Sequence, residues 1–280
     1  MSVLGIDIGG TSLKVVCVED GEVVWERQSE RYQRPTFPQL EASLVKCLDG
    51  ARGEIIGLCA PGAFDVSRGM VTASANMPCL VGVELAKWIK RIAGDNAKVV
   101  VETDVYSTAM SIWRERFGRG RMCVIALGTG VGMSILTDGQ RLLINGKSSG
   151  HLGQIDVTLD DEPPVVGTDG GKGGLEGYIG LAALQARYGE DVAGSIAKFN
   201  ERSAPLRALA RAIRIVHAIY RPDEIVLAGG VGIMLKAAAV PLEVLVLDGL
   251  TNLARPHWKL RFAGSAFHAA RGVAMLASEG

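Results

Sequence analysis

Short apolar runs separated by glycine-containing turns open the chain. The runs cover residues 3–8, 13–19 and 22–28, and an Asp20-Gly21 pair separates the last two. Apolar runs of this length bounded by glycine and aspartate predict strands, and Asp-Gly between two of them is typical of a tight hairpin turn. We therefore expect three consecutive strands joined by short turns.

The same pattern recurs in the second part of the chain. Apolar runs at 122–127, 131–137 and 140–144 follow one another, and Asp138-Gly139 separates the last two. In each half a glycine and threonine cluster joins the first strand to the second, at residues 9–11 and at residues 128–130. Two such signatures at matching places predict a duplicated β-hairpin architecture.

The rest of the chain alternates between strand and helix patterns. Strands are predicted at 54–59, 98–102 and 224–227, and helices at 83–93, 105–117, 175–188, 205–220 and 265–277. This alternation predicts an α/β fold. The basic stretch 114–121 contains Gly118 and Gly120 and is the predicted domain junction, which gives domains 1–118 and 119–280. The closing helix, about residues 265–278, is a candidate to pack back on the first domain.

Composition narrows the class of protein. The chain has 280 residues, of which 48% are hydrophobic, and its 30 basic residues balance 30 acidic ones, so we expect a soluble protein with small-molecule partners and no nucleic acid. Five scattered cysteines without a C-x-x-C pair fit a reducing cytosol. We expect no signal peptide, because the first strand begins near Val3, and no apolar run that crosses a membrane. A cytoplasmic enzyme is the leading class.

The first turn carries residues suited to phosphate. Asp7 ends a strand, Gly9 and Gly10 allow close backbone approach, and Thr11 and Lys14 follow. Backbone N–H groups and the Thr11 hydroxyl can donate to phosphoryl oxygens, Lys14 adds positive charge, and Asp7 can hold Mg²⁺ directly or through water. The alternative is an ordinary glycine hairpin. Rossmann and Walker motifs are excluded, because no helix follows the glycines.

The segment from Asp7 to Lys14 resembles the phosphate-one motif of the actin-like sugar kinases, and within them that of the ROK (repressor, open reading frame, kinase) family. The resemblance continues along the chain through segments 57–65, 74–78, 128–132, 225–231 and 264–277. It implies a two-domain actin-like ATPase (ribonuclease H-like) fold with an interdomain cleft. It also implies ATP and Mg²⁺ as cosubstrate and cofactor, and a homodimer.

The resemblance assigns roles to individual residues. Asp104 is similar to the family's catalytic base, a role that suits a carboxylate between a strand and a helix, although a helix N-cap is the alternative at this position. The implied nucleotide-binding residues are Asp7, Gly9, Gly10, Thr11, Lys14, Gly128, Thr129, Gly130, Gly132, Gly229 and Gly230.

The acceptor side departs from the family pattern. An ungapped alignment places His151 where the family has a sugar-binding Glu, and Gln154 where it has a His that contacts zinc and sugar. The family's zinc cysteines fall on Gly167, Asp169 and Gly174. Because glycine, aspartate and glutamine replace the thiolates and the imidazole, we expect no structural zinc.

Glu176 keeps the identity of a family sugar contact, whereas Thr103 replaces the Asn that usually precedes the base. The implied acceptor-binding residues are Gly62, Asn76, Thr103, Asp104, His151, Gln154 and Glu176. His151 and Gln154 have an alternative as loop residues without ligand contact. A changed set of hydrogen-bonding groups shifts acceptor choice, so we expect specificity to differ from that of typical glucokinases.

The expected activity is phosphoryl transfer from ATP to a hydroxyl of a sugar or sugar-like polyol. Three alternatives remain: a sugar-sensing transcription regulator, a non-catalytic or regulatory sugar-binding protein of the same fold, and an actin-like ATPase or chaperone. The sequence does not identify the acceptor sugar or the hydroxyl that is phosphorylated, and it leaves the phosphoryl donor open between ATP and another compound.

Overall fold

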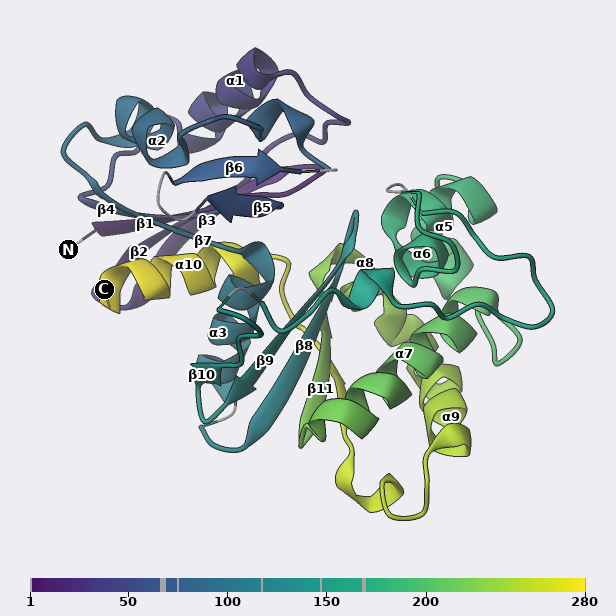
Figure 1. Ribbon diagram of the computed structural model, residues 1–280. Coiled ribbons are helices and arrows are strands. Elements are labelled where there is room, and N and C mark those ends of the chain that lie inside the picture. Colours follow the sequence, from purple (N-terminus) through teal and green to yellow (C-terminus); the bar gives the residue numbers. More distant parts are fainter. Residues whose placement is uncertain are drawn as a thin grey trace. The chain divides into compact units, whose positions relative to one another are not determined.

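The structure of the protein is a computed structural model that describes residues 2–65, 69–74, 76–116, 118–146, 148–167 and 170–279. The chain divides into two compact units. The first combines Met1–Arg116 with Phe267–Gly280, and the second comprises Phe117–Ala266. Each unit contains a five-stranded mixed sheet with helices packed against it (Figure 1).

The sheet of the first unit has the order β3-β2-β1-β4-β7. β1 (Ser2–Ile8), β2 (Leu13–Glu19) and β3 (Glu22–Gln28) are antiparallel neighbours, and β4 (Ile55–Cys59) and β7 (Lys98–Glu102) continue the sheet parallel to β1. Asp20 and Gly21 both have positive φ, 50° and 85°, as a tight hairpin between twisted strands requires. The predicted strands and the Asp-Gly turn are confirmed.

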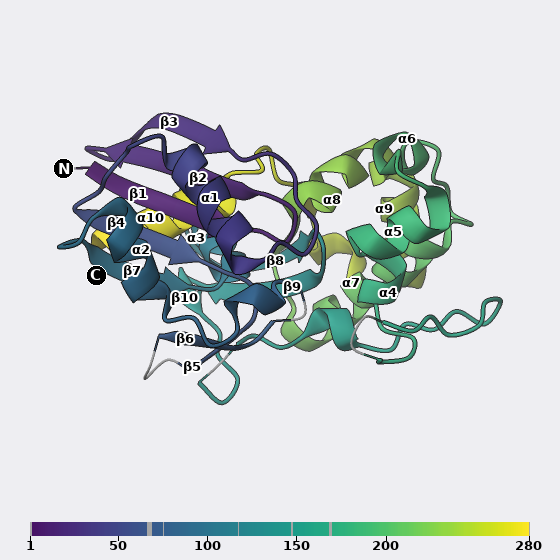
Figure 2. The same ribbon diagram turned by 90° about the horizontal axis from the view of Figure 1, so that it is seen from above.

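Helices cover both faces of this sheet (Figures 1 and 2). α1 (Phe37–Leu48) and α2 (Leu85–Ala93) bury Leu40, Leu44 and Trp88 against one face. α10 (His268–Glu279) packs on the other face, and α3 (Asp104–Arg116) packs on α10. The short strands β5 (Ala63–Asp65) and β6 (Met70–Ala73) form a separate hairpin, which the 3₁₀ helix η1 (Pro78–Leu80) follows.

α10 lies close to its neighbours because glycines face it. A Cβ added to Gly5 or Gly57 of the sheet would overlap the carbonyl groups of Ala270 or Val273 on α10. On α10 itself, a Cβ at Gly272 would overlap the carbonyl of Ser107 on α3. The closing helix predicted from the sequence is therefore present, starts at His268, and belongs to the first unit.

The sheet of the second unit repeats the strand order and directions of the first. β8 (Arg121–Leu127), β9 (Val131–Thr137) and β10 (Gln140–Arg141) are antiparallel neighbours, and β11 (Glu224–Ala228) and β12 (Leu260–Phe262) extend the sheet parallel to β8. The predicted duplication is confirmed. The third strand is shorter than predicted and ends at Arg141. The Ser149 hydroxyl accepts the Ile135 N–H and donates to the Leu142 carbonyl, so these two groups do not bond to each other and the pairing stops.

The helices of the second unit enclose its larger core around α7 (Ala204–Tyr220). The predicted helix over 175–188 is interrupted, because Gly180 is extended (φ −63°, ψ 149°) between α4 (Glu176–Ile179) and α5 (Leu181–Tyr188). The other helical segments are η2 (Leu152–Gln154), α6 (Val192–Ile196), α8 (Gly229–Met234), η3 (Leu235–Ala238), α9 (Ala239–Gly249) and η4 (Arg255–His257).

One segment bears on the expectation about membranes. The segment Gly229–Gly249 has 21 residues and a hydropathy of 1.9, so it is long and apolar enough to cross a membrane by length and composition. The expectation considered only uninterrupted apolar runs, whereas a span tolerates a few charges such as Lys236 and Glu243. The segment consists of α8, η3 and α9, and α9 packs on α7. A helix that packs in the core of a globular protein passes the same test, so this one segment is weak support for a membrane span.

Candidate active site

Asp7 lies at the C-terminal end of β1 and is almost completely buried. It is paired in register with Lys14 on β2 and with Cys59 on β4. The Lys14 ammonium lies 3.4 Å from Asp7 Oδ2, and the Cys59 thiol donates to Asp7 Oδ1 at 3.7 Å. Desolvation and the Asp7 carboxylate hold the pKa of the Cys59 thiol well above its usual value. The thiol therefore stays protonated and supports the Asp7 carboxylate.

The first glycine-threonine turn follows directly after this carboxylate. The Gly9 N–H donates to the carbonyl of Ser12 at 3.1 Å, which closes the turn between β1 and β2. Gly9, Gly10 and Thr11 are partly exposed, whereas Ile8 before them is fully buried. The structure therefore brings the predicted residues Asp7, Gly9, Gly10, Thr11 and Lys14 together at one end of β1 and β2.

Asp104 enters the same neighbourhood from a different strand. It is the first residue of α3, two positions after β7 ends at Glu102, and Glu102 is in register with Cys59. Desolvation, and after it the Asp7 carboxylate, raise the pKa of Asp104 to about 6, although backbone N–H groups and Lys14 act in the opposite direction. Asp104 is therefore mostly ionised at neutral pH, with a pKa suited to accepting a proton.

The helix N-cap alternative for Asp104 is wrong by one position. Thr103 precedes the first helical residue, and its carbonyl accepts the N–H of Ser107. The Asp104 carboxylate accepts the N–H of Val105 at 2.9 Å, which satisfies one backbone donor of the first helical turn. Its structural role is therefore local and leaves the carboxylate with further acceptor capacity.

Two further predicted acceptor residues belong to the first unit. Gly62 follows β4 and has a φ of 129°, and a Cβ there would overlap the carbonyl of Ala73, so this position requires glycine. Asn76 follows β6 and is half-buried. Its neighbour Ala75, which is part of the predicted sugar-side loop, lies outside the described residues.

The second glycine-threonine turn, Gly128 to Gly130, joins β8 to β9, and Gly132 pairs with Ala126 just beyond it. The Gly128 N–H donates to the carbonyl of Gly130 at 3.0 Å. Gly229 follows β11 with a φ of 78°, and a Cβ there would overlap the carbonyl of Leu127 at the start of this turn.

Gly229 and Gly230 are therefore neighbours of the second turn. A Cβ at Gly230 would meet no atom within 4 Å, and the same holds for Gly128. The space above both glycines is open, as it must be where a ligand approaches the backbone closely.

The Glu176 carboxylate holds the second turn through a backbone hydrogen bond. Its Oε2 accepts the N–H of Val131 at 2.9 Å, and the Leu181 N–H donates to the carbonyl of Gly128 at 2.9 Å. The start of α4 and the start of α5 therefore both contact the turn. Sequence reasoning assigned Glu176 to the sugar and did not predict this contact with backbone.

His151 and Gln154 lie at the two ends of the short helix η2, and both side chains are exposed. A Cβ at Gly174 would lie 3.9 Å from the Cα of Gln154, so this loop and the segment before Glu176 are adjacent.

Backbone hydrogen bonds hold the loop that precedes Glu176. The Gly173 N–H donates to Val165 at 2.7 Å, the Val157 N–H to Gly173 at 2.9 Å, and the Gly167 N–H to Gly171 at 2.7 Å. Of the three positions aligned with zinc cysteines, Asp169 lies outside the described residues. Within the part of the chain that the structure describes, no group of three or more His, Cys, Asp or Glu is placed to hold a metal ion.

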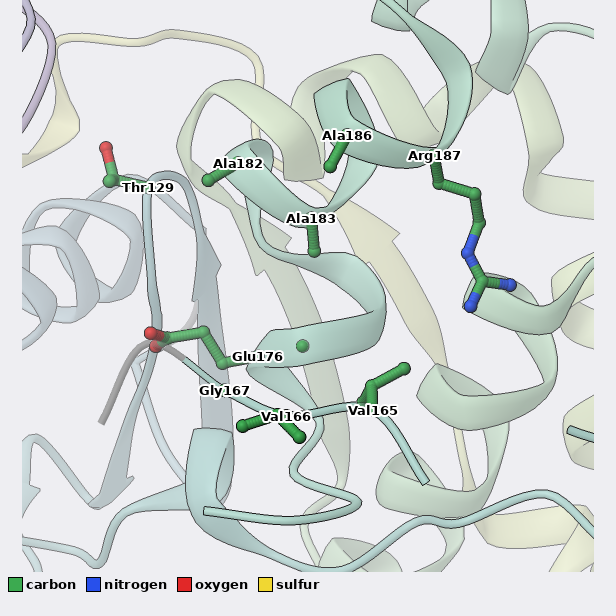
Figure 3. A pocket seen from close by; sticks show the side chains of 10 residues that line it. Thr129, Val165, Val166, Gly167, Glu176, Ala182, Ala183, Ala186 and Arg187 are labelled. Carbon is green, nitrogen blue, oxygen red and sulfur yellow. The ribbon is translucent and has the colours of Figure 1, made fainter. Parts of the chain in front are cut away.

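A cavity of about 540 Å³ opens beside the second turn (Figure 3). Thr129 and Glu176 stand at one end of it, and Arg187, which forms a bidentate ion pair with Glu162 at 2.9 Å, stands at the other. The wall between them is apolar and consists of Val165, Val166, Ala182, Ala183 and Ala186. Sequence reasoning missed these residues, although three alanines on one side of α5 were a signal that this surface admits a flat group.

A sequence model of the ROK family matches residues 3–279 of the chain. The chain belongs to the ROK family. The glucokinase of Thermotoga maritima is 25% identical to it over 285 residues, which covers 89% of this chain and 88% of that protein. The N-acetylgalactosamine kinase AgaK of Shewanella sp. (strain ANA-3) is 26% identical over 302 residues, covering 97% and 95%.

The fold agrees with membership of the ROK family. A ROK family glucokinase from Streptomyces griseus, whose crystal structure contains glucose and AMPPNP, matches this chain with a TM-score of 0.79 at 21% identity, and each chain is covered completely. The expected actin-like ATPase fold, built on two mixed sheets, is confirmed. The curated relatives named above are sugar kinases.

Proposed function

We propose that this ROK-family chain is an ATP-dependent sugar kinase that transfers the γ-phosphoryl group to a hydroxyl of a sugar or sugar-like polyol. One observation carries the proposal: Asp104, with a pKa of about 6, lies in the same neighbourhood as Asp7, whose strand leads directly into the first glycine-threonine turn. Phosphoryl transfer depends above all on positioning and on neutralising charge, and this neighbourhood supplies groups for both.

Asp104 acts as the general base. The acceptor hydroxyl attacks the γ-phosphorus, the new O–P bond forms as the bond to the β-phosphate oxygen breaks, and Asp104 accepts the hydroxyl proton while ADP leaves with the electron pair. A pKa of about 6 keeps most of the base ionised at neutral pH and close enough to 7 to take up the proton.

In the first unit the turn at Gly9 to Thr11 binds phosphate, with Lys14 adding positive charge, and in the second unit the turn at Gly128 to Gly130 offers backbone donors of the same kind. Asp7 would hold Mg²⁺ through water. Its buried carboxylate already accepts from Lys14 and Cys59, and a site with few protein oxygens suits an ion that usually keeps several waters. When bound, Mg²⁺ neutralises charge on the phosphates.

The adenosine binds in the second unit, near Gly229 and Gly230. The cavity beside Thr129 supports this assignment, because its apolar wall of alanine and valine suits the face of a base better than a polyol, whose hydroxyls need many polar partners.

The proposed acceptor-binding residues are Gly62, Asn76, Thr103 and Asp104 in the first unit, and His151, Gln154 and Glu176 in the second. The class of acceptor differs from that of typical glucokinases. The relatives include a glucokinase and an N-acetylgalactosamine kinase, so acceptor choice varies within the family. The imidazole of His151 and the amide of Gln154 offer donors where a carboxylate only accepts, and such an exchange changes which sugar hydroxyls are recognised.

The rest of the assignment follows from composition and family. We propose a cytoplasmic homodimer without nucleic-acid partners, whose two actin-like domains are residues 1–118 and 119–280 with the closing helix belonging to the first. A net charge of zero and five free cysteines support this proposal. Light scattering after size exclusion tests the oligomeric state.

An ADP-release screen over hexoses, N-acetylated amino sugars, pentoses and cyclitols tests the activity. We expect at least one acceptor to be turned over. Asp104→Asn then lowers kcat by about 10²- to 10⁴-fold while the Kd for an ATP analogue stays within about twofold. If the variant keeps near wild-type turnover, Asp104 is not the base.

A non-catalytic sugar-binding protein is the second candidate, because the loop around His151 and Gln154 has lost most of the family pattern. Calorimetry distinguishes the two. Sugar binding in the presence of MgATP without any phosphorylated product favours the second candidate, and product formation excludes it.

A further inference from the structure

The segment that follows β3 runs along the first glycine-threonine turn and is bonded to it. The Ser29 N–H donates to the carbonyl of Leu13 at 3.0 Å, and its hydroxyl oxygen accepts the Leu13 N–H at 2.9 Å. The Gln28 side-chain amide donates to the Ser12 hydroxyl at 3.1 Å. These bonds therefore hold the end of the turn, where β2 begins.

Tyr32 fixes the turn itself with two hydrogen bonds. Its hydroxyl donates to the carbonyl of Gly9 at 2.6 Å, and its backbone N–H donates to the carbonyl of Thr11 at 3.0 Å. One residue therefore holds two carbonyl groups of the turn, one through its side chain and one through its backbone.

These two bonds determine the direction of two backbone donors. In a trans peptide the C=O and the following N–H point in opposite directions, and the structure contains no cis peptide among the residues it describes. Because Tyr32 holds the carbonyls of Gly9 and Thr11, the N–H groups of Gly10 and Ser12 point away from Tyr32. Without the hydroxyl bond, the plane between Gly9 and Gly10 is free to rotate, since glycine restricts it little.

The surroundings of Tyr32 keep its hydroxyl in place and protonated. The ring packs against the core of the first unit and is only partly exposed. Desolvation, and after it the Asp7 and Cys79 groups, raise the pKa of Tyr32 above its usual value. The hydroxyl is therefore a permanent donor to Gly9.

We propose that Tyr32 is a positioning residue for the nucleotide: by holding the Gly9 carbonyl from behind, it turns the Gly10 N–H toward the phosphate. This inference rests on the proposed kinase function and names a residue that the family motifs do not include. Tyr32 itself does not touch the phosphate, so removing its hydroxyl weakens nucleotide binding through the backbone alone.

Tyr32→Phe tests the proposal, because it removes the hydroxyl and keeps the ring. We expect the Kd for a non-hydrolysable ATP analogue with Mg²⁺, measured by calorimetry without sugar, to rise about three- to tenfold, the range of one neutral hydrogen bond. The KM for ATP rises by a similar factor, while the KM for the acceptor stays within about twofold.

Tyr220→Phe is the matched control. It also removes a hydroxyl that donates to a backbone carbonyl, that of Ser149 at 3.1 Å in the second unit, and Ser149 does not belong to either turn. We expect a similar small loss of thermal stability in both variants and an unchanged Kd for the analogue in Tyr220→Phe.

The outcomes distinguish a failure of the proposed function from a failure of the positioning role of Tyr32. If the wild-type protein neither binds the analogue nor turns over any sugar, the proposed function fails. If the wild type binds and Tyr32→Phe binds equally well, or if the KM values for ATP and acceptor rise together, the role of Tyr32 is structural and the inference is overturned.

Discussion

At the scale of single residues, the proposed chemistry depends on two carboxylates, Asp7 and Asp104, which lie at the same edge of the first sheet. Asp7 is buried and held by Lys14 and Cys59, whereas Asp104 lies at the start of α3 with a pKa raised to about 6. Asp104 is mostly ionised at neutral pH, and its raised pKa suits it to accept a proton as the base.

The activity should depend on pH through Asp104. We expect kcat/KM to fall about tenfold per pH unit below pH about 6 and to level off above it, because only the ionised carboxylate accepts a proton. Initial rates at saturating MgATP and limiting acceptor, between about pH 5 and pH 8, measure this limb. A limb near the ordinary aspartate pKa of 3.8 contradicts the desolvated placement of Asp104.

The same residue should reduce stability at neutral pH. The pKa of Asp104 is higher in the folded state than its ordinary value of 3.8, so the folded state binds this proton more tightly. Stability from this group is therefore gained as pH falls through about 6 and is lost as pH rises through it. Urea unfolding should show Asp104→Asn at least as stable as wild type at pH about 7, and relatively less stable near pH about 4. A variant that is less stable at both values indicates a structural role.

At the scale of elements, the packing of α10 depends on the missing side chains of three glycines. Gly57→Ala places a methyl group against the carbonyl of Val273 and should lower the free energy of unfolding by about 1–3 kcal/mol. Gly230→Ala is the control, because a methyl group there meets open space on a helix and should be neutral or slightly stabilising. Equal loss in both variants contradicts the close approach of α10.

The loop before Glu176 should fold without zinc. Backbone hydrogen bonds between Val157, Val165 and Gly173 hold this loop. We expect elemental analysis to find far less than one zinc per chain, and a chelator to leave the melting temperature unchanged within about 1 °C, since a structural zinc contributes directly to folding. A drop in melting temperature on chelation contradicts this expectation.

The sequence predicts elements that local residue preferences determine. It does not predict features that contacts between distant segments determine. The Asp20-Gly21 and Asp138-Gly139 turns fix both hairpins, because their positive φ angles suit few other pairs. α1 is absent from the predicted elements, although the capping box of Thr36 and Gln39 and Pro38 in the first turn are both signals of a helix start. The break at Gly180 comes from contact with the second turn, which no local pattern records.

At the scale of the whole molecule, the repeated strand order explains why the family motifs occur twice. Each sheet begins with a hairpin whose first turn is rich in glycine, so each offers backbone at the same edge. Motif order along the chain was enough to predict this duplication and the family. The contact of Glu176 with Val131 was not predictable, and only the alanines of α5 gave a sign of the cavity, because both features arise from residues far apart in sequence.

Removing the last helix should affect the first unit specifically. A chain that ends at residue 266 lacks α10, which leaves Val3 and Val16 of the sheet without their partners Ala270 and Ala274. We expect this variant to lose cooperative unfolding of the first unit and to aggregate, because it exposes a continuous apolar face. Near wild-type solubility and an unchanged unfolding curve contradict this.

Because α10 follows the second unit in the chain but belongs to the first unit, the order of synthesis differs from the order of assembly. A ribosome releases β1 to α3 early, yet the face that α10 covers stays open until all 150 residues of the second unit, 117–266, have been made. At about 5–20 residues per second this delay lasts on the order of ten seconds. During that time the nascent sheet exposes an apolar surface. Chaperones or a neighbouring chain can bind this surface before α10 has been made.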